Sequence, residues 1–169
     1  MNNCPEYINT ALVVGLGSIG KRHIKILKEI YPDIKIIVLR HRRRTEKLEE
    51  VEKTVYDLKE ALNHNPDIAL ICNPSSKHLE AALPLVESGI HLLIEKPVSS
   101  KSEEVNELIT LSKKRNTKIL VGYNLKFLDS LNAFKEEIEK GSVGQVLSIR
   151  AEVGQHLDSW REDKSYLNS

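Results

Sequence analysis

The sequence has few aromatic residues, few cysteines and no long apolar run. Its 169 residues include one Trp, two Phe, five Tyr and two Cys. Cys4 and Cys72 lie far apart and match no zinc or redox spacing, so we expect neither a metal site nor a disulfide scaffold. The longest apolar run, from Ile68 to Cys72, has five residues. Because a membrane span needs about 20 apolar residues, we expect no membrane-spanning segment.

The charge is almost balanced, with 25 Lys and Arg against 24 Asp and Glu and a net charge of +1. A near-neutral chain without aromatics among its basic residues argues against a nucleic-acid partner. Residues 1–10 have no apolar stretch typical of a secretion signal. We therefore predict a cytoplasmic protein.

Short apolar runs alternate with amphipathic stretches over residues 10–122. The expected strands are 10–15, 34–39, 54–56, 67–72, 91–95 and 118–122. The helix after Gly15 places one apolar stripe at helical spacing, made of Ile19, His23, Ile26, Leu27 and Ile30. Strands that are almost wholly apolar and alternate with helices predict an α/β fold. We expect a doubly wound parallel sheet of the Rossmann type.

Local signals predict where several helices begin and end. Asp57 is placed to cap a short helix, with Glu60 three residues later. Gly89 is expected to end the helix that contains Pro84. Ser100 or Ser102 is expected to open the helix that follows.

The pattern changes near Tyr123, which predicts a second domain. Phe127, Leu131, Phe134 and Ile138 share one helical face, a turn follows at 141–144, and residues 145–153 alternate like a strand. We therefore assign residues 1–122 to the first domain and 123–169 to the truncated start of an α+β second domain.

The segment from Gly15 to Gly20 reads Gly-Leu-Gly-Ser-Ile-Gly, between the first predicted strand and helix. In this context the motif predicts a dinucleotide site. Gly15 allows a tight turn, Gly17 lets a pyrophosphate approach the backbone, and Gly20 lets the helix pack on the strand. The helix start, with Ser18 and Ile19, offers free N–H groups to the phosphates. The alternative is a tight turn that binds no ligand.

Basic residues follow the second predicted strand, where NAD sites usually carry an acid. In this chain the position of that acid is occupied by Arg40, His41 and Arg42. An acid there would repel the 2′-phosphate of NADP, whereas guanidinium groups can bind it. We therefore favour NADP over NAD. A solvated basic loop is the alternative.

Two further segments follow the fourth and fifth predicted strands, where a doubly wound sheet places its ligands. Asn73-Pro74-Ser75, with His78 after it, can contact a ribose, although it is also a good helix start. Glu95-Lys96-Pro97 places a lysine at a strand end, either as a surface charge or as a proton donor to a substrate oxygen.

Together these segments resemble the glucose–fructose oxidoreductase/inositol dehydrogenase/MocA-type (Gfo/Idh/MocA) NAD(P)-dependent oxidoreductases over about residues 10–169. Gly122-Tyr123-Asn124, Gly154 to Leu157 and Trp160-Arg161 add to the resemblance. It implies hydride transfer between a nicotinamide and a sugar, sugar-nucleotide or polyol carbon, with Lys96 at the reacting oxygen. It also implies a homo-oligomer through the second domain. The motifs and the resemblance together predict these cofactor-binding residues: Gly15, Gly17, Ser18, Ile19, Gly20, Arg40, His41, Arg42, Asn73, Pro74, Ser75, His78, Glu95, Lys96, Asn124, Trp160 and Arg161.

The sequence leaves three functions open. The chain is the cofactor-binding part of an oxidoreductase, inactive by itself because the second domain is cut short. Alternatively it is a non-enzymatic dinucleotide-binding or regulatory module, or a remnant whose glycine turn binds nothing. The match of residues 123–169 to the opening of a second domain favours the first.

Overall fold

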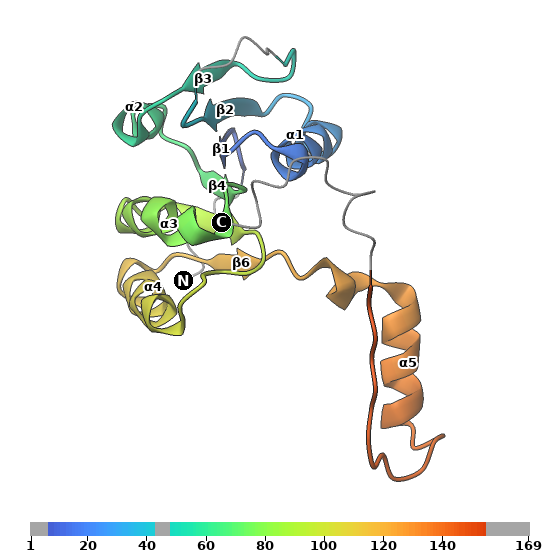
Figure 1. The fold of residues 1–169 in the computed structure, drawn as a ribbon. Helices are drawn as coiled ribbons and strands as arrows, with labels where there is room; N and C mark the ends of the chain where they lie inside the picture. The colour runs from blue at the N-terminus through green and yellow to red at the C-terminus, as the bar shows by residue number, and fades with distance from the viewer. Residues whose placement is uncertain (1–6, 43–47, 155–169) are drawn as a thin grey trace. The chain divides into compact units, whose positions relative to one another are not determined.

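The computed structural model describes residues 7–42 and 48–154. The chain divides into two compact units, residues 1–122 and 123–169. In the first unit, six parallel strands form one sheet in the order β3-β2-β1-β4-β5-β6 (Figure 1). The strands are β1 Thr10–Val14, β2 Lys35–Leu39, β3 Lys53–Val55, β4 Ile68–Ile71, β5 His91–Ile94 and β6 Ile119–Val121. The sheet grows outward in both directions from the β1–β4 pair, so the predicted doubly wound fold is confirmed.

Helices cover both faces of this sheet. They are α1 Ser18–Ile30, α2 Leu58–Leu62, α3 His78–Glu87 and α4 Ser102–Arg115. Figure 1 shows α1 on one side of the sheet and α2, α3 and α4 on the other, and each side has its own buried apolar cluster. None of the described helices is long and apolar enough to cross a membrane.

The strand register brings the carboxyl ends of the strands to one edge of the sheet. Val14 is level with both Leu39 and Ile71, Ile71 with Ile94, and Ile94 with Val121. The loops after β1, β2, β4, β5 and β6 therefore leave the sheet at the same edge. This is the edge at which doubly wound sheets bind ligands.

The predicted helix boundaries agree with the structure in the first unit. The Asp57 carboxylate accepts the backbone N–H of Glu60 at 3.1 Å and caps α2. Gly89, with φ +82°, follows the end of α3, and Pro84 lies inside that helix. Of the two serines considered for the start of α4, Ser102 is its first residue.

The predicted buried face of α1 is rotated from the one observed. The buried residues are Gly20, Ile24 and Leu27, while Ile30 is 61% exposed. The cause is Gly20, since a Cβ there would overlap the carbonyl oxygen of Gly15. This close approach turns the Gly20 side of the helix toward the sheet, and Ile24 and Leu27 follow at i+4 and i+7.

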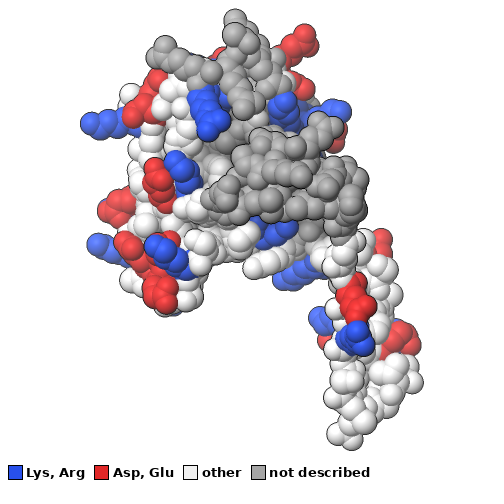
Figure 2. Space-filling view, in the orientation of Figure 1, with Lys and Arg blue, Asp and Glu red and all other residues white. Residues whose placement is uncertain are grey.

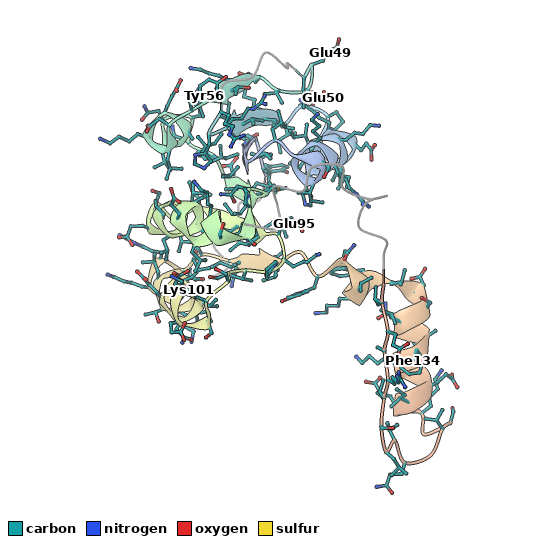
Figure 3. All side chains as sticks on the ribbon, in the orientation of Figure 1. Glu49, Glu50, Tyr56, Glu95, Lys101 and Phe134 are labelled. Atoms are coloured by element: carbon teal, nitrogen blue, oxygen red, sulfur yellow. The ribbon has the colours of Figure 1, made fainter. Side chains whose placement is uncertain are left out.

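The second unit contains the short turn η2 Asn124–Phe127 and the helix α5 Asp129–Glu139. Its apolar side chains stay largely open, with Leu131 45% and Phe134 52% exposed (Figure 3). The strand predicted at 145–153 is wrong, because the structure has no strand there. Alternation alone does not form a strand, since a strand needs a neighbouring strand to bond its backbone.

Candidate functional site

The turn after β1 is built on a close contact between two backbone segments. Gly15 has φ +94°, a conformation that glycine adopts without steric cost. A Cβ on Gly15 would lie 2.8 Å from the backbone nitrogen of Asn73. The Gly15 N–H donates to the carbonyl of Leu39 at 2.9 Å. The tight turn predicted at Gly15 is confirmed, and it presses against the loop after β4.

Gly17 occupies the N-cap of α1 and leaves the start of that helix open. No side chain caps the helix, and its first turn has no acidic residue. A Cβ on Gly17 would meet nothing within 4 Å among the described residues. Uncapped N–H groups and the positive end of the helix dipole attract an anion. The backbone here is therefore accessible to a phosphate group.

Asn73 lies in the loop after β4 and is only 9% exposed. Its side-chain Nδ2 donates to the carbonyl of Lys77 at 3.0 Å. Its Oδ1 is buried and has no hydrogen-bond partner among the described residues. Pro74 is exposed, and Ser75 begins the short turn η1 Ser75–Lys77. A buried acceptor without a donor is costly, and a bound ligand can supply the donor.

Glu95 directly follows β5, and its carboxylate lies close to both His23 and Gly122; Figure 3 labels Glu95. Nε2 of His23, on α1, donates to its Oε1 at 2.8 Å. On another side, a Cβ added to Gly122 would lie 3.1 Å from the same Oε1. Lys96, the next residue, is exposed. The chain therefore fixes Glu95 and presents Lys96 outward.

The sequence patterns do not indicate this His23–Glu95 pair. They predict His23 on the inward stripe of α1, as its one polar member. A histidine among apolar residues three positions after Gly20 was the available signal. Its partner, Glu95, lies 72 positions further along the chain, and helical periodicity predicts contacts only between residues a few positions apart.

His78 is buried, with 1% of its side chain exposed. Its Nδ1 lies 2.8 Å from the carbonyl oxygen of Pro97, and its Nε2 lies 2.9 Å from that of Asn73. The resemblance implied that His78 lines the cofactor. In the structure both ring nitrogens face the backbone of two loops instead.

Cys72 directly follows β4 and is buried. Burial, with a smaller contribution from the negative charge of Glu95, raises the pKa of the Cys72 thiol to about 12. The thiol therefore stays neutral at physiological pH and is a poor nucleophile.

The basic segment after β2 differs from the expectation in one respect. Arg40 is only 7% exposed, whereas His41 and Arg42 are exposed. The backbone N–H of Arg40 donates to the carbonyl of Val55 at 3.0 Å, which continues the pairing of β2 with β3 by one residue. Arg40 therefore belongs to the packed edge of the sheet, and Arg42 is the exposed guanidinium of the described segment.

The remaining predicted residues lie in or beyond the second unit. Asn124 is exposed and is the first residue of η2. Trp160 and Arg161 lie outside the described residues. Within residues 7–42 and 48–154, no group of three His, Cys, Asp or Glu side chains is placed to hold a metal ion.

The described charged side chains are mixed in sign on the face shown in Figure 2. Lys and Arg alternate with Asp and Glu, as in the ion pairs Lys101–Glu104 at 3.4 Å and Lys135–Glu139 at 3.5 Å. Exposed pairs of this kind contribute little to stability. This mixture agrees with the net charge of +1.

A glycine turn that leads into an uncapped helix, at the carboxyl edge of a doubly wound sheet, defines the class of dinucleotide-binding proteins. The sequence model of the oxidoreductase family with an NAD-binding Rossmann fold matches residues 9–123. The chain belongs to this Gfo/Idh/MocA oxidoreductase family. The resemblance stated from the sequence is thus confirmed.

Two curated relatives show the range of enzymes in this family. The chain is 31% identical over 143 residues to myo-inositol 2-dehydrogenase of Thermotoga maritima, covering 82% of this chain and 43% of the relative. It is 27% identical over 111 residues to UDP-N-acetylglucosamine 3-dehydrogenase of Acidithiobacillus ferrooxidans, covering 66% of this chain and 36% of the relative. The chain therefore spans less than half the length of these relatives.

A solved structure supports the fold. Scyllo-inositol dehydrogenase of Lactobacillus casei, determined with NAD(H) and scyllo-inositol, superposes with a TM-score of 0.72 at 23% identity. The match covers 82% of this chain and 43% of that one. At this level of identity the similarity establishes the shared fold.

Proposed function

We propose that this chain is the nicotinamide-cofactor-binding part of an oxidoreductase that transfers hydride to or from a sugar, sugar-nucleotide or polyol carbon. The observation that carries the proposal is the open backbone at Gly17, at the uncapped start of α1. Family membership makes a dinucleotide the expected ligand of this feature.

The residues at the carboxyl edge fit a dinucleotide in two places. Backbone N–H groups at Gly17, Ser18 and Ile19 would hold the pyrophosphate. The unpartnered Oδ1 of Asn73 would accept a hydrogen bond from a ribose hydroxyl or an amide of the nicotinamide half. When bound, the cofactor supplies the hydride acceptor or donor, and the protein supplies alignment.

Lys96 is the residue we propose to act on the reacting oxygen. It is exposed, and its neighbour Glu95 is anchored by His23 at 2.8 Å. An ammonium held at this place would donate a hydrogen bond to a carbonyl oxygen, or return a proton to the product alkoxide.

We also propose that NADP is preferred over NAD. Exposed Arg42, with His41 beside it, follows β2, where an NAD site usually carries an acid. A guanidinium can bind a 2′-phosphate with two parallel hydrogen bonds. Because Arg40 is buried at the sheet, Arg42 is the arginine of the described segment whose guanidinium is exposed. The proposed preference for NADP therefore rests on Arg42.

The substrate class rests on what the relatives act on, together with the resemblance of the second unit. Relatives with 31% and 27% identity are named for a polyol and a sugar nucleotide. Asn124, Trp160 and Arg161 remain predicted residues of the cofactor and substrate cleft. Association of two or more copies through residues 123–169 remains a prediction as well.

The test is a calorimetric titration of the 169-residue chain with NADPH and with NADH at fixed salt. We expect saturable binding of both, with NADPH binding more tightly. Tighter NADH binding would overturn the NADP preference and leave the dinucleotide site in place. Binding of neither would overturn the proposed function.

A further inference from the structure

His78 connects two loops that follow different strands. It is the first residue of α3, and its ring lies between the carbonyl oxygens of Asn73 and Pro97 at 2.9 and 2.8 Å. Asn73 belongs to the loop after β4, and Pro97 to the loop after β5. With 1% of the side chain exposed, no ring nitrogen is open to solvent.

The two loops carry the groups on which the proposed chemistry depends. Asn73 holds the unpartnered Oδ1 next to the backbone contact with Gly15. Pro97 directly follows exposed Lys96. The His78 ring therefore contacts Asn73 on one side and Pro97, which directly follows Lys96, on the other.

An imidazole ring is rigid, so the two carbonyl oxygens in contact with its nitrogens lie at a set separation. A neutral ring donates to one of the two carbonyls, and a protonated ring donates to both. Neither carbonyl belongs to a strand or helix, so the ring replaces the regular backbone pairing that buried carbonyls need. Without the ring, the spacing of the two loops would depend on weaker packing contacts.

We propose that His78 is a positioning residue that sets the distance between Asn73 and Lys96. It thereby places the nicotinamide half of the cofactor against the proton-donating lysine. This inference rests on the proposed function, because it assumes that a nicotinamide dinucleotide binds at this edge. The adenine half, held at the glycine turn and after β2, does not depend on His78.

The test compares NADH with ADP, which lacks the nicotinamide and its ribose. The variant His78→Gln keeps a buried amide that reaches one carbonyl and releases the other. We expect it to weaken NADH binding about five- to tenfold, the effect of losing about one hydrogen bond, and ADP binding less than about twofold. Equal weakening of both ligands would mean that His78 only supports the fold, and would overturn the inference.

The matched control is His91→Gln. His91 is the first residue of β5, so it lies at the end of that strand away from Glu95 and Lys96. Its Nδ1 accepts the backbone N–H of Lys118 at 2.9 Å. We expect this variant to bind both ligands like the wild type. A loss of NADH affinity equal to that of His78→Gln would also overturn the inference.

Wild-type binding separates failure of this inference from failure of the proposed function. If the wild type binds neither NADH nor ADP, the proposed function fails. If it binds both equally tightly, the dinucleotide site stands, but the nicotinamide half is not held and His78 has no positioning role.

A second measurement needs no variant, in case His78→Gln does not fold. The ring nitrogens of wild-type His78 can be followed by ¹⁵N NMR during the same two titrations. We expect NADH to shift the ring resonances more than ADP does, because ADP lacks the nicotinamide and ribose that would contact the two loops. Identical shifts with the two ligands would overturn the inference.

Discussion

His23 and Glu95 lie 72 positions apart in the chain and are joined by a hydrogen bond of 2.8 Å between Nε2 and Oε1. The two side chains are 18% and 16% exposed, so the bond is partly shielded from water. It connects the helix that follows the glycine turn to the segment that carries Lys96. Gly122 allows this, since a Cβ there would crowd the same carboxylate at 3.1 to 3.2 Å.

The first prediction concerns the strength of this bond. In a double-mutant cycle with His23→Ala and Glu95→Ala, we expect a coupling of about 1 kcal/mol in the free energy of unfolding, measured with urea. Lys25→Ala, an exposed change on α1, is the control and should give no coupling with Glu95→Ala. Additive effects of His23→Ala and Glu95→Ala would show that the bond does not stabilise the fold.

The second prediction separates two glycines of the same turn. Gly17→Ala should change the free energy of unfolding by less than about 1 kcal/mol, because its Cβ meets nothing within 4 Å. It should weaken NADH binding at least about tenfold, because the methyl group occupies the path of the phosphates. Gly15→Ala should instead destabilise the fold by about 2 kcal/mol or more, because of its φ of +94° and the contact with Asn73.

Calorimetry and urea unfolding of the two glycine variants check this contrast. A Gly17→Ala variant that binds NADH like the wild type would remove the glycine turn from the binding site.

The third prediction concerns cofactor choice. Arg42→Ser should weaken NADPH binding about tenfold and NADH binding less than about twofold, since it removes one charge-assisted contact to the 2′-phosphate. Lys113→Ser, which removes an exposed positive charge from the end of α4, is the control for net charge. Equal losses for both cofactors in Arg42→Ser would count against a phosphate contact.

The fourth prediction concerns Lys96. In a protein that joins this chain to a complete second domain, and with a polyol or sugar that supports turnover, Lys96→Met should lower the rate by about a hundredfold or more and change NADH affinity by less than about threefold. Lys101→Met, five residues further along and exposed, should leave both quantities near their wild-type values. An unchanged rate in Lys96→Met would exclude the lysine from proton transfer.

The fifth prediction follows from the raised pKa of Cys72. The folded thiol titrates at about 12, against 9.0 for the unperturbed group. Above pH 9 the unfolded chain has lost this proton while the folded chain keeps it, so the free energy of unfolding falls as pH rises. The slope should be at most about 1.4 kcal/mol per pH unit, and it should be smaller in Cys72→Ala.

Urea unfolding between pH 8 and about 10.5 checks this slope. Cys4→Ser should retain the wild-type slope. In that background, a thiol reagent should label Cys72 only after unfolding. Rapid labelling of the folded protein would contradict the buried, neutral thiol.

Several features were predictable because they depend on neighbours in the chain. Asp57 caps α2 and Gly89 follows α3 for reasons contained within a few residues of sequence. The strands β1, β2 and β4 are recognisable from sequence because a strand covered on both faces is apolar along most of its length. The glycine turn was recognisable because its spacing and its place between a strand and a helix are both local.

Other features could not be predicted from the sequence, because they depend on contacts that exist only in the folded chain. The rotation of α1 depends on contact between Gly20 and Gly15, which helical periodicity does not include. The burial of Arg40 depends on its backbone bond to Val55, on a neighbouring strand. The strand predicted at 145–153 has the right alternation but did not form, because alternation does not specify a partner strand.

The sequence by itself determined the order of strands and helices, the glycine turn and the family of this protein, because each depends on residues close together in the chain. Only the tertiary structure decided that His23 holds Glu95 and that His78 lies between Asn73 and Pro97. These contacts join helices and loops that meet only after the crossovers between the strands have formed. Side-chain chemistry specifies which groups can bond, and the register of the sheet decides which of them meet.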